Sequence, residues 1–86
     1  MITNQNILIT GGFGLIGSNL IKSLLNKKFN LIIIDSLIDK TEKNINVFRN
    51  FIKKNKIIFY QTDLKNFEKV RKVFEKHSIH CIIHLA

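Results

Sequence analysis

The sequence predicts an α/β fold in which a four-stranded parallel sheet is doubly wound, with helices on both faces. Two observations predict it. Short apolar runs alternate with segments of helical periodicity in the order β-α-β-α-β-α-β, and all four glycines fall between residues 11 and 17. Strands that alternate with helices form right-handed crossovers and therefore a parallel sheet. The expected strand order is 3-2-1-4, which leaves the fourth strand as an uncovered edge.

Four apolar runs are the expected strands, and they span residues 6–10, 31–34, 56–61 and 79–86. Each is short and largely apolar, which is typical of strands that are buried on both faces of a parallel sheet. Cys81 lies in the last run, so it is expected to act as a buried small hydrophobe. A single cysteine also favours a reduced, cytoplasmic protein without disulfides.

Three segments between these runs carry apolar residues at helical spacing. Their expected buried stripes are Leu15, Ile16, Leu20, Ile21, Leu24 and Leu25 in segment 15–29; Ile45, Phe48 and Ile52 in the second; and Phe67, Val70, Val73 and Phe74 in segment 66–77. Asp39 and Glu42 form a plausible cap and capping partner for the second helix. Asn66 is the candidate N-cap of the third.

The chain has 86 residues, which is enough for one small domain or for part of a larger one. Its net charge of +8 comes almost entirely from lysines on the expected solvent faces of helices. There is no arginine-rich stripe and no interleaving of basic and aromatic residues, so nucleic-acid binding is not expected. No apolar run approaches the ~18 residues that a membrane span requires, and no secretory signal precedes the first strand.

The glycine cluster can be read in two registers, as Gly12-x-Gly14-x-x-Gly17 or as Gly11-x-x-Gly14-x-x-Gly17. It directly follows an expected strand and opens an expected helix, which is the setting of a dinucleotide-binding loop. Glycine permits a tight turn and close approach of the backbone to a pyrophosphate, and the helix N-terminus attracts its charge. A P-loop is excluded because no Lys-Ser/Thr pair follows Gly17, whereas an ordinary glycine-rich turn remains the alternative.

Two aspartates end the second and third expected strands, where the crevice of such a fold lies. Asp35 stands 18 residues after Gly17 and could accept both hydroxyls of an adenosine ribose. Its charge would repel a 2′-phosphate, which favours NAD over NADP despite the nearby Lys40. Asp63 could bind the adenine amino group, with Leu64 against the ring. Capping of the following helix by Asp63 is an equal alternative.

The three histidines, His77, His80 and His84, alternate between a helix end and a strand without a surrounding set of cysteines or carboxylates. Solvated histidines, or structural histidines with satisfied hydrogen bonds, are therefore expected, and no metal site.

The segment "TGGFGLIGSNL" resembles the phosphate-binding loop of the extended short-chain dehydrogenase/reductases that act on nucleotide sugars, a family with a Rossmann-type fold. "LIIIDSL", "IIFYQTDL" and "KHSIHCIIHLA" are similar to the family's next three signatures. This resemblance assigns the register Gly11, Gly14 and Gly17, with Gly12 as an extra glycine of the turn. Within the family, the combination is most similar to the UDP-glucose 4-epimerases.

The resemblance implies a set of NAD-binding residues that share the carboxyl ends of the strands. They are Gly11, Gly14, Leu15, Ile16 and Gly17 at the pyrophosphate, Asp35 and Ser36 at the ribose, Asp39 and Lys40 in the following loop, Asp63 and Leu64 at the adenine, and Leu85 and Ala86 after the fourth strand. The family usually has an Asn-Ser pair where Asp39 and Lys40 stand, and more often Phe where Leu85 stands.

The family's chemistry uses a Tyr-x-x-x-Lys pair with a serine or threonine, and none of this is found here. The only tyrosine, Tyr60, is followed at the fourth place by Leu64. The resemblance thus implies that residues 1–86 are the N-terminal part of an NAD-binding Rossmann domain, with no catalytic residue and no substrate domain, inactive alone. The complete protein would be a cytoplasmic homodimer that interconverts UDP-glucose and UDP-galactose through a transient 4-keto sugar. A 4,6-dehydratase, a uronate epimerase or a truncated non-catalytic remnant are the alternatives.

Overall fold

The computed structural model describes residues 5–37 and 42–86. Its four strands form one parallel sheet in the order β3-β2-β1-β4, as the sequence predicts. The elements in chain order are β1 (Asn6–Thr10), α1 (Leu15–Leu25), β2 (Asn30–Asp35), α2 (Glu42–Val47), α3 (Arg49–Lys53), β3 (Ile57–Gln61), α4 (Phe67–Lys76) and β4 (Cys81–His84).

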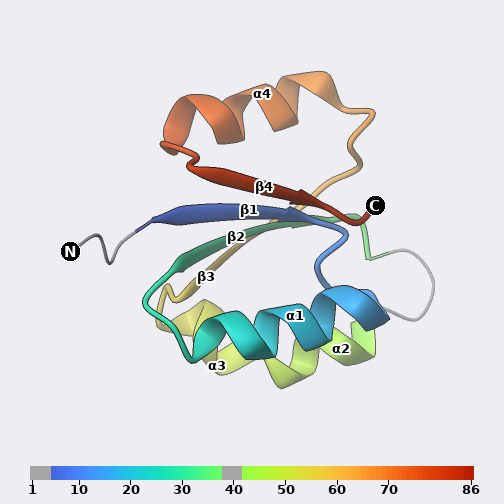
Figure 1. Cartoon of the computed structure of the whole chain (residues 1–86). Helices are drawn as coiled ribbons and strands as arrows, with labels where there is room; N and C mark the ends of the chain where they lie inside the picture. The colour runs from blue at the N-terminus through green and yellow to red at the C-terminus, as the bar shows by residue number, and fades with distance from the viewer. Residues whose placement is uncertain (1–4, 38–41) are drawn as a thin grey trace.

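The sheet lies between two helical layers, with α1, α2 and α3 on one face and α4 on the other (Figure 1). Successive side chains of a strand point to opposite faces, so β1 and β2 contribute to both cores. Ile9 and Ile33 belong to the larger core with α1, α2 and α3, whereas Ile32 belongs to the smaller core with Val73 of α4. The doubly wound α/β prediction is therefore confirmed.

Helix α1 is shorter than expected, because it ends at Leu25 and residues 26–28 form a turn. The expected stripe is also wrong at its beginning: Leu15 and Ile16 are 80% and 72% exposed. At 3.6 residues per turn, Leu15 lies roughly half a turn around the helix from Leu24, which packs against the core. Leu15 therefore faces away from the sheet, and Ile16 is exposed beside it in the first turn of the helix.

The second helical segment is divided into α2 and α3 at Phe48. Ile45 and Phe48 are buried and Ile52 packs against the same core, so the predicted apolar spacing is confirmed although the helix is broken. Phe48 has φ −106° and ψ 6°, which lies outside the helical region and ends the regular hydrogen-bond ladder. Asp39 lies outside the described residues, so its capping contact with Glu42 stays a prediction.

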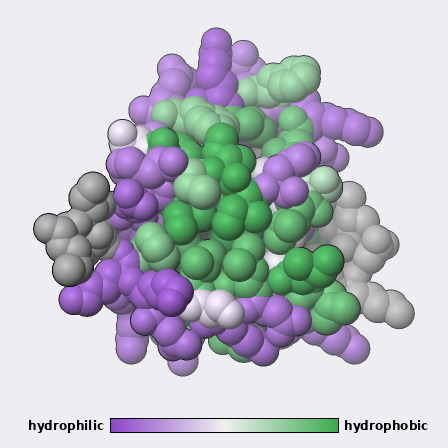
Figure 2. Space-filling model, viewed as in Figure 1, coloured by the Kyte–Doolittle hydropathy of each residue, from purple (hydrophilic) through white to green (hydrophobic). Residues whose placement is uncertain are grey.

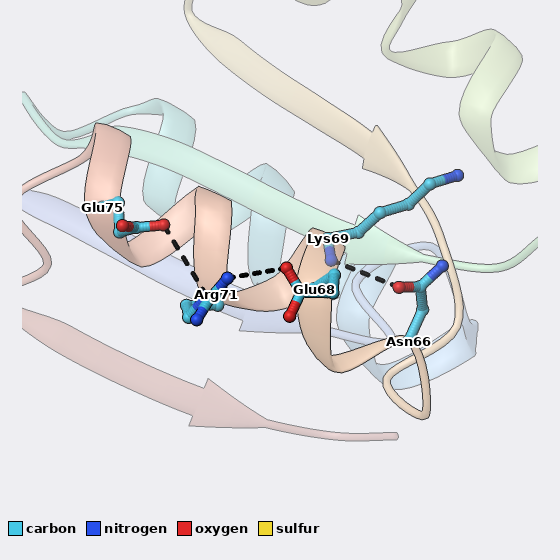
Figure 3. A network of polar contacts seen from close by, with 5 residues as sticks. All are labelled: Asn66, Glu68, Lys69, Arg71 and Glu75. Carbon is cyan, nitrogen blue, oxygen red and sulfur yellow. Dashed lines mark hydrogen bonds and ion pairs between the residues drawn. The ribbon is translucent and has the colours of Figure 1, made fainter.

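Helix α4 has the predicted N-cap, because Asn66 Oδ1 accepts a hydrogen bond from the Lys69 N–H at 3.2 Å (Figure 3). The helix carries exposed ion pairs from Arg71 to Glu68 at 2.6 Å and to Glu75 at 3.9 Å. Its predicted apolar stripe is only partly buried. Val73 is buried, whereas Phe67 is 80% and Phe74 42% exposed. No second helix of the described chain lies beside α4 on this face, so the outer part of the stripe has nothing to pack against (Figure 1).

We expect Asn66→Ala to lower the free energy of unfolding by about 1 kcal/mol, because the Lys69 N–H loses the acceptor that caps the helix. Urea denaturation followed by circular dichroism measures this loss. Arg71→Ala is the matched control on the same helix, and it should cost less than about 0.5 kcal/mol because its ion pairs are exposed. Equal losses in the two variants would contradict the capping role.

Strand β4 pairs with β1 alone among the described strands and forms an edge of the sheet. Cys81 on this strand is exposed, which corrects the expectation of a buried cysteine, and Ile82 is 54% exposed. Figure 2 shows hydrophobic residues gathered over the strands, between α4 above and α1 below. The apolar side chains of β4 are therefore only partly covered by the described residues, 5–37 and 42–86.

Candidate functional site

The glycine loop makes its turn at the carboxyl end of β1. Gly11 has φ +68°, in the left-handed region that favours glycine, and its N–H donates to the Ile34 carbonyl at 2.8 Å. The Gly14 N–H donates to the Gly11 carbonyl at 3.3 Å, and the Ser18 N–H donates to the Gly14 carbonyl at 2.9 Å. This turn directs the N-terminus of α1 across the carboxyl ends of the strands.

At three of the four glycines, neighbouring atoms of the protein leave no space for a side chain. A Cβ at Gly17 would lie 2.4 Å from the Gly12 carbonyl oxygen, and one at Gly11 would lie 3.0 Å from the Ala86 nitrogen. A Cβ at Gly12 would lie 2.7 Å from Ile33 Cγ2. Gly12 is thus needed for packing against β2 and is more than an extra glycine of the turn.

Gly14 differs, because the protein would accept a Cβ there. Its φ of −70° suits any residue, and the nearest atom to an added Cβ is the Gly11 carbonyl oxygen at 3.5 Å, an ordinary contact. A glycine that neither the backbone nor the packing requires leaves open space above the N-terminus of α1. This space lies at the start of the first helix, where a ligand can approach the backbone closely.

Asp35 is buried at the end of β2, and both of its carboxylate oxygens accept backbone hydrogen bonds. The Phe13 N–H donates to Oδ2 at 2.9 Å, and the Leu37 N–H donates to Oδ1 at 2.8 Å. Asp35 therefore holds the glycine loop, a role that sequence reasoning did not find. A carboxylate has about four acceptor positions, so each oxygen keeps capacity for one further donor.

Two hollows flank Gly11 at this edge of the sheet. The first has a volume of about 120 Å³ and is lined by Gly11, Ile34, Asp35, Ser36, Thr62, Asp63, Leu64 and Ala86. The second has a volume of about 290 Å³ and is lined by Gly11, Gly14, Leu15, Ile16, Gly17 and Leu85. Gly11 lines both hollows; the first lies at the ends of β2 and β3 and the second at the N-terminus of α1.

Every residue that the sequence assigns to the cofactor site lines one of these hollows, apart from Asp39 and Lys40, which lie outside the described residues. The structure thus brings the predicted residues together, while their contacts with a cofactor stay predictions. Sequence reasoning missed Ile34 and Thr62, which also line the first hollow. Thr62 follows the third strand immediately, so its position at the strand end was an available signal.

Asp63 does not cap helix α4, so that alternative is wrong. Its Oδ1 accepts from the Lys65 N–H at 2.9 Å in a local turn, and its carbonyl accepts from the Asn66 N–H at 3.0 Å. Asn66 is the N-cap. The exposed Asp63 side chain stands at the first hollow, and its contact with an adenine stays a prediction.

The second hollow offers the electrostatics of a helix N-terminus. The first N–H groups of a helix have no intrahelical acceptor, and within the described chain those of Leu15 and Ile16 have no other hydrogen-bond partner. Together with the helix dipole, such groups favour an anion. The negative charge of Asp35 lies in the other hollow, where it favours hydroxyl donors. The two hollows therefore differ in their electrostatics in the way that the charged and uncharged parts of a dinucleotide require, one favouring an anion and the other hydroxyl donors.

The histidines each take part in a hydrogen bond, as expected. His77 Nε2 pairs with the Tyr60 hydroxyl at 2.7 Å, His80 Nδ1 accepts from the Asn6 N–H at 2.9 Å, and His84 Nδ1 pairs with Thr10 Oγ1. Within residues 5–37 and 42–86, no group of three or more histidines, cysteines and carboxylates could hold a metal ion.

The pKa of His77 is lowered from its ordinary value of 6.5, mainly because burial disfavours the charged imidazolium and also because Lys76 repels it. The unfolded chain therefore binds the proton at higher pH than the folded chain. This contribution to stability is complete above pH 6.5 and is lost as pH falls through the lower folded pKa.

We expect the free energy of unfolding to fall more steeply between about pH 7 and pH 5 in the unmodified chain than in His77→Gln. Denaturant titrations at a series of pH values measure both slopes. The comparison cancels the titration of the other histidines and of the carboxylates, which both chains share. Parallel slopes would show that His77 titrates alike in the folded and unfolded states.

A doubly wound parallel sheet, a glycine loop that opens the first helix and an acidic residue that ends the second strand define a Rossmann-type fold. The family model described as GDP-mannose 4,6 dehydratase matches residues 8–86. The chain belongs to this family. The resemblance to the enzymes that act on nucleotide sugars is thereby confirmed.

Individual proteins agree with this assignment. The UDP-glucose 4-epimerase of Neisseria gonorrhoeae is 35% identical over 82 residues, which are 95% of this chain and 24% of that protein. The structure of the UDP-Glc/GlcNAc 4-epimerase of Campylobacter jejuni has a TM-score of 0.81 at 28% identity over 95% of this chain and 24% of that one. The dTDP-glucose 4,6-dehydratase of Bacillus anthracis str. Ames, solved in complex with NAD, has a TM-score of 0.80 at 26% identity over 95% and 26%.

The chain spans about a quarter of the length of these relatives, and it is homologous to that part of the epimerases and the related dehydratases. None of the helices in the described ranges has the length and apolar character of a membrane span.

Proposed function

We propose that this chain is the NAD-binding part of a nucleotide-sugar enzyme of the UDP-glucose 4-epimerase type. The observation that carries the proposal is the open space above Gly14, where neither backbone strain nor a protein contact requires a glycine. A bound pyrophosphate supplies the reason for a glycine there, because it approaches the backbone where a methyl group would stand. The N–H groups of Leu15 and Ile16 would then bind its oxygens.

The remaining parts of NAD would occupy the first hollow. Asp35 would accept the adenosine ribose hydroxyls beside Ser36, and Asp63 and Leu64 would contact the adenine. A 2′-phosphate would meet the buried charge of Asp35, so the site favours NAD over NADP. When bound, NAD would take hydride from the sugar and return it. The residues of this chain hold and orient the cofactor, and the proposal places no catalytic residue among them.

For the complete protein we propose UDP-glucose and UDP-galactose interconversion through a transient 4-keto sugar, in a cytoplasmic homodimer. The 35% identity to the UDP-glucose 4-epimerase of Neisseria gonorrhoeae supports the proposed epimerase activity. A 4,6-dehydratase is the second candidate, because the matching family model and the Bacillus anthracis structure carry that name. The two reactions differ in product, since a dehydratase eliminates water from the sugar and an epimerase does not.

Calorimetric titration of the 86-residue chain with NAD and with NADP tests cofactor binding. We expect NAD to bind at least about tenfold more tightly, a difference of about 1.4 kcal/mol. Gly14→Ala should leave the unfolding transition nearly unchanged and weaken NAD binding, because its Cβ enters only the open space. Equal NAD affinity of Gly14→Ala and the unmodified chain would contradict the proposed cradle, and so would a folded chain without NAD affinity.

A chimera tests whether this chain can supply the cofactor site of an epimerase. This chain would replace the homologous quarter of the Neisseria gonorrhoeae enzyme, which supplies the remaining three quarters and with them the catalytic residues. Formation of UDP-galactose from UDP-glucose would show that the chain holds NAD in a productive position, and a folded chimera without this activity would contradict the proposal. The product that the complete protein forms from UDP-glucose distinguishes the two candidates: UDP-galactose supports the epimerase and a 4-keto-6-deoxy sugar the dehydratase.

A further inference from the structure

Phe13, between the glycines of the loop, is held from three directions. Its ring is fully buried, with ring centroids 5.0 Å from Phe59 and 5.9 Å from Phe48. Its N–H donates to Asp35 Oδ2 at 2.9 Å. Its carbonyl accepts from Asn44 Nδ2 at 2.7 Å. The two peptide planes that flank Phe13 are thus fixed by side chains from two other elements, the end of β2 and helix α2.

Asn44 is distant from the glycine loop in the sequence but contacts it in the structure. Asn44 belongs to α2, which is the next element after β2 and its Asp35. Its side chain reaches 31 positions back along the chain to Phe13. The carbonyl that it binds belongs to the Phe13–Gly14 peptide, the unit directly before the open space above the N-terminus of α1. A change in this peptide plane would redirect the Gly14 N–H and the start of the helix.

We propose that Asn44 is a positioning residue that fixes the phosphate-binding loop of this chain. The inference rests on the proposed function, because it assigns the loop a pyrophosphate. Asn44 lies outside the proposed cofactor contacts. It acts through the Phe13 carbonyl, whose peptide group sets the direction of the free N–H groups at Leu15 and Ile16. Asp35 fixes the N–H group of the same phenylalanine. Phe13 is thus held between Asp35, on the ribose side of the site, and Asn44 of helix α2.

The sharpest variant is Asn44→Asp, which preserves size and replaces the amide donor by an acceptor facing the Phe13 carbonyl. Asn46→Ala is the matched control, because Asn46 lies on the same helix and makes only an exposed contact with Arg49 Nε at 2.8 Å. Dissociation constants for NAD, ADP and adenosine separate the two halves of the site. We expect Asn44→Asp to weaken NAD and ADP about five- to tenfold, as loss of one hydrogen bond permits. Adenosine, which lacks the pyrophosphate, should bind as before.

A second measurement does not depend on cofactor binding. Amide hydrogen exchange of the free chain should be faster at Phe13 and Gly14 in Asn44→Asp than in Asn46→Ala or the unmodified chain. Unchanged exchange together with unchanged NAD affinity would overturn the inference, and so would an equal loss of adenosine affinity. If the unmodified chain binds no NAD, the proposed function fails, and faster exchange confined to the loop would still support the positioning role of Asn44.

Discussion

Replacing Gly17 by alanine is expected to lower the free energy of unfolding by about 3 kcal/mol or more, which is at the upper end for overpacking. The new Cβ would lie 2.4 Å from the Gly12 carbonyl oxygen, 2.6 Å from the Gly12 carbonyl carbon and 2.8 Å from the Gly11 carbonyl oxygen. All three are backbone atoms of the turn, so no side chain can move aside. Either α1 shifts away from the turn or the turn opens.

Chemical denaturation followed by circular dichroism measures this loss. For a domain of this size a loss of about 3 kcal/mol corresponds to a fall in Tm of roughly 12–24 °C, so we expect Gly17→Ala to be largely unfolded at ambient temperature. Gly14→Ala is the matched control three residues earlier in the same loop, where the nearest atom to the new Cβ is 3.5 Å away. Similar stability of the two variants would show that the contact at Gly17 is relieved without cost.

Asp35→Ala is expected to weaken both the fold and the cofactor site. The fold loses the acceptor of the buried Phe13 N–H and of the Leu37 N–H, which should cost about 2–4 kcal/mol of unfolding free energy. NAD affinity should fall about 100-fold, because two ribose hydroxyls lose a charged acceptor and the glycine loop loses its tie to β2. Discrimination against NADP should disappear, since the charge that repels a 2′-phosphate is gone.

Two further variants separate these effects. Asp35→Asn keeps the size and one acceptor oxygen, so it should be more stable than Asp35→Ala and still lose the preference for NAD. Asp63→Ala removes an exposed carboxylate after β3 that, among the described residues, accepts only from the Lys65 N–H. It should cost less than about 1 kcal/mol. Calorimetry that finds the full NAD preference in Asp35→Asn would contradict the role of the charge.

The strands and their order could be predicted because the relevant signals are local. β2 is buried on both faces, and its residues 31–34 read as an uninterrupted apolar run. The alternation of strands and helices predicts a parallel sheet, and β3-β2-β1-β4 is the order of a Rossmann-type sheet, in which a glycine loop follows the first strand. The glycine loop and Asp35 could be placed at the same edge of the sheet for a related reason, since parallel strands all end there.

The predictions that were wrong concern which apolar faces of the helices and strands are buried. Periodicity assigned Leu15, Ile16, Phe67 and Phe74 to buried faces, and the structure exposes all four. Hydrophobic spacing identifies an apolar face, but burial also requires a second surface that covers it. The prediction that Cys81 is buried was wrong for the same reason, because its strand is an edge of the sheet.

The sequence by itself determined the layout of the site: a glycine loop after β1, an aspartate after β2 and another after β3. Covalent order and strand burial are sufficient for this layout. Only the tertiary structure decided how the loop is held, with Phe13 packed between aromatic rings and its peptide groups bound by Asp35 and Asn44. These contacts join residues that are 22 and 31 positions apart. Their geometry depends on how β2 and α2 pack against the loop, which no local pattern encodes.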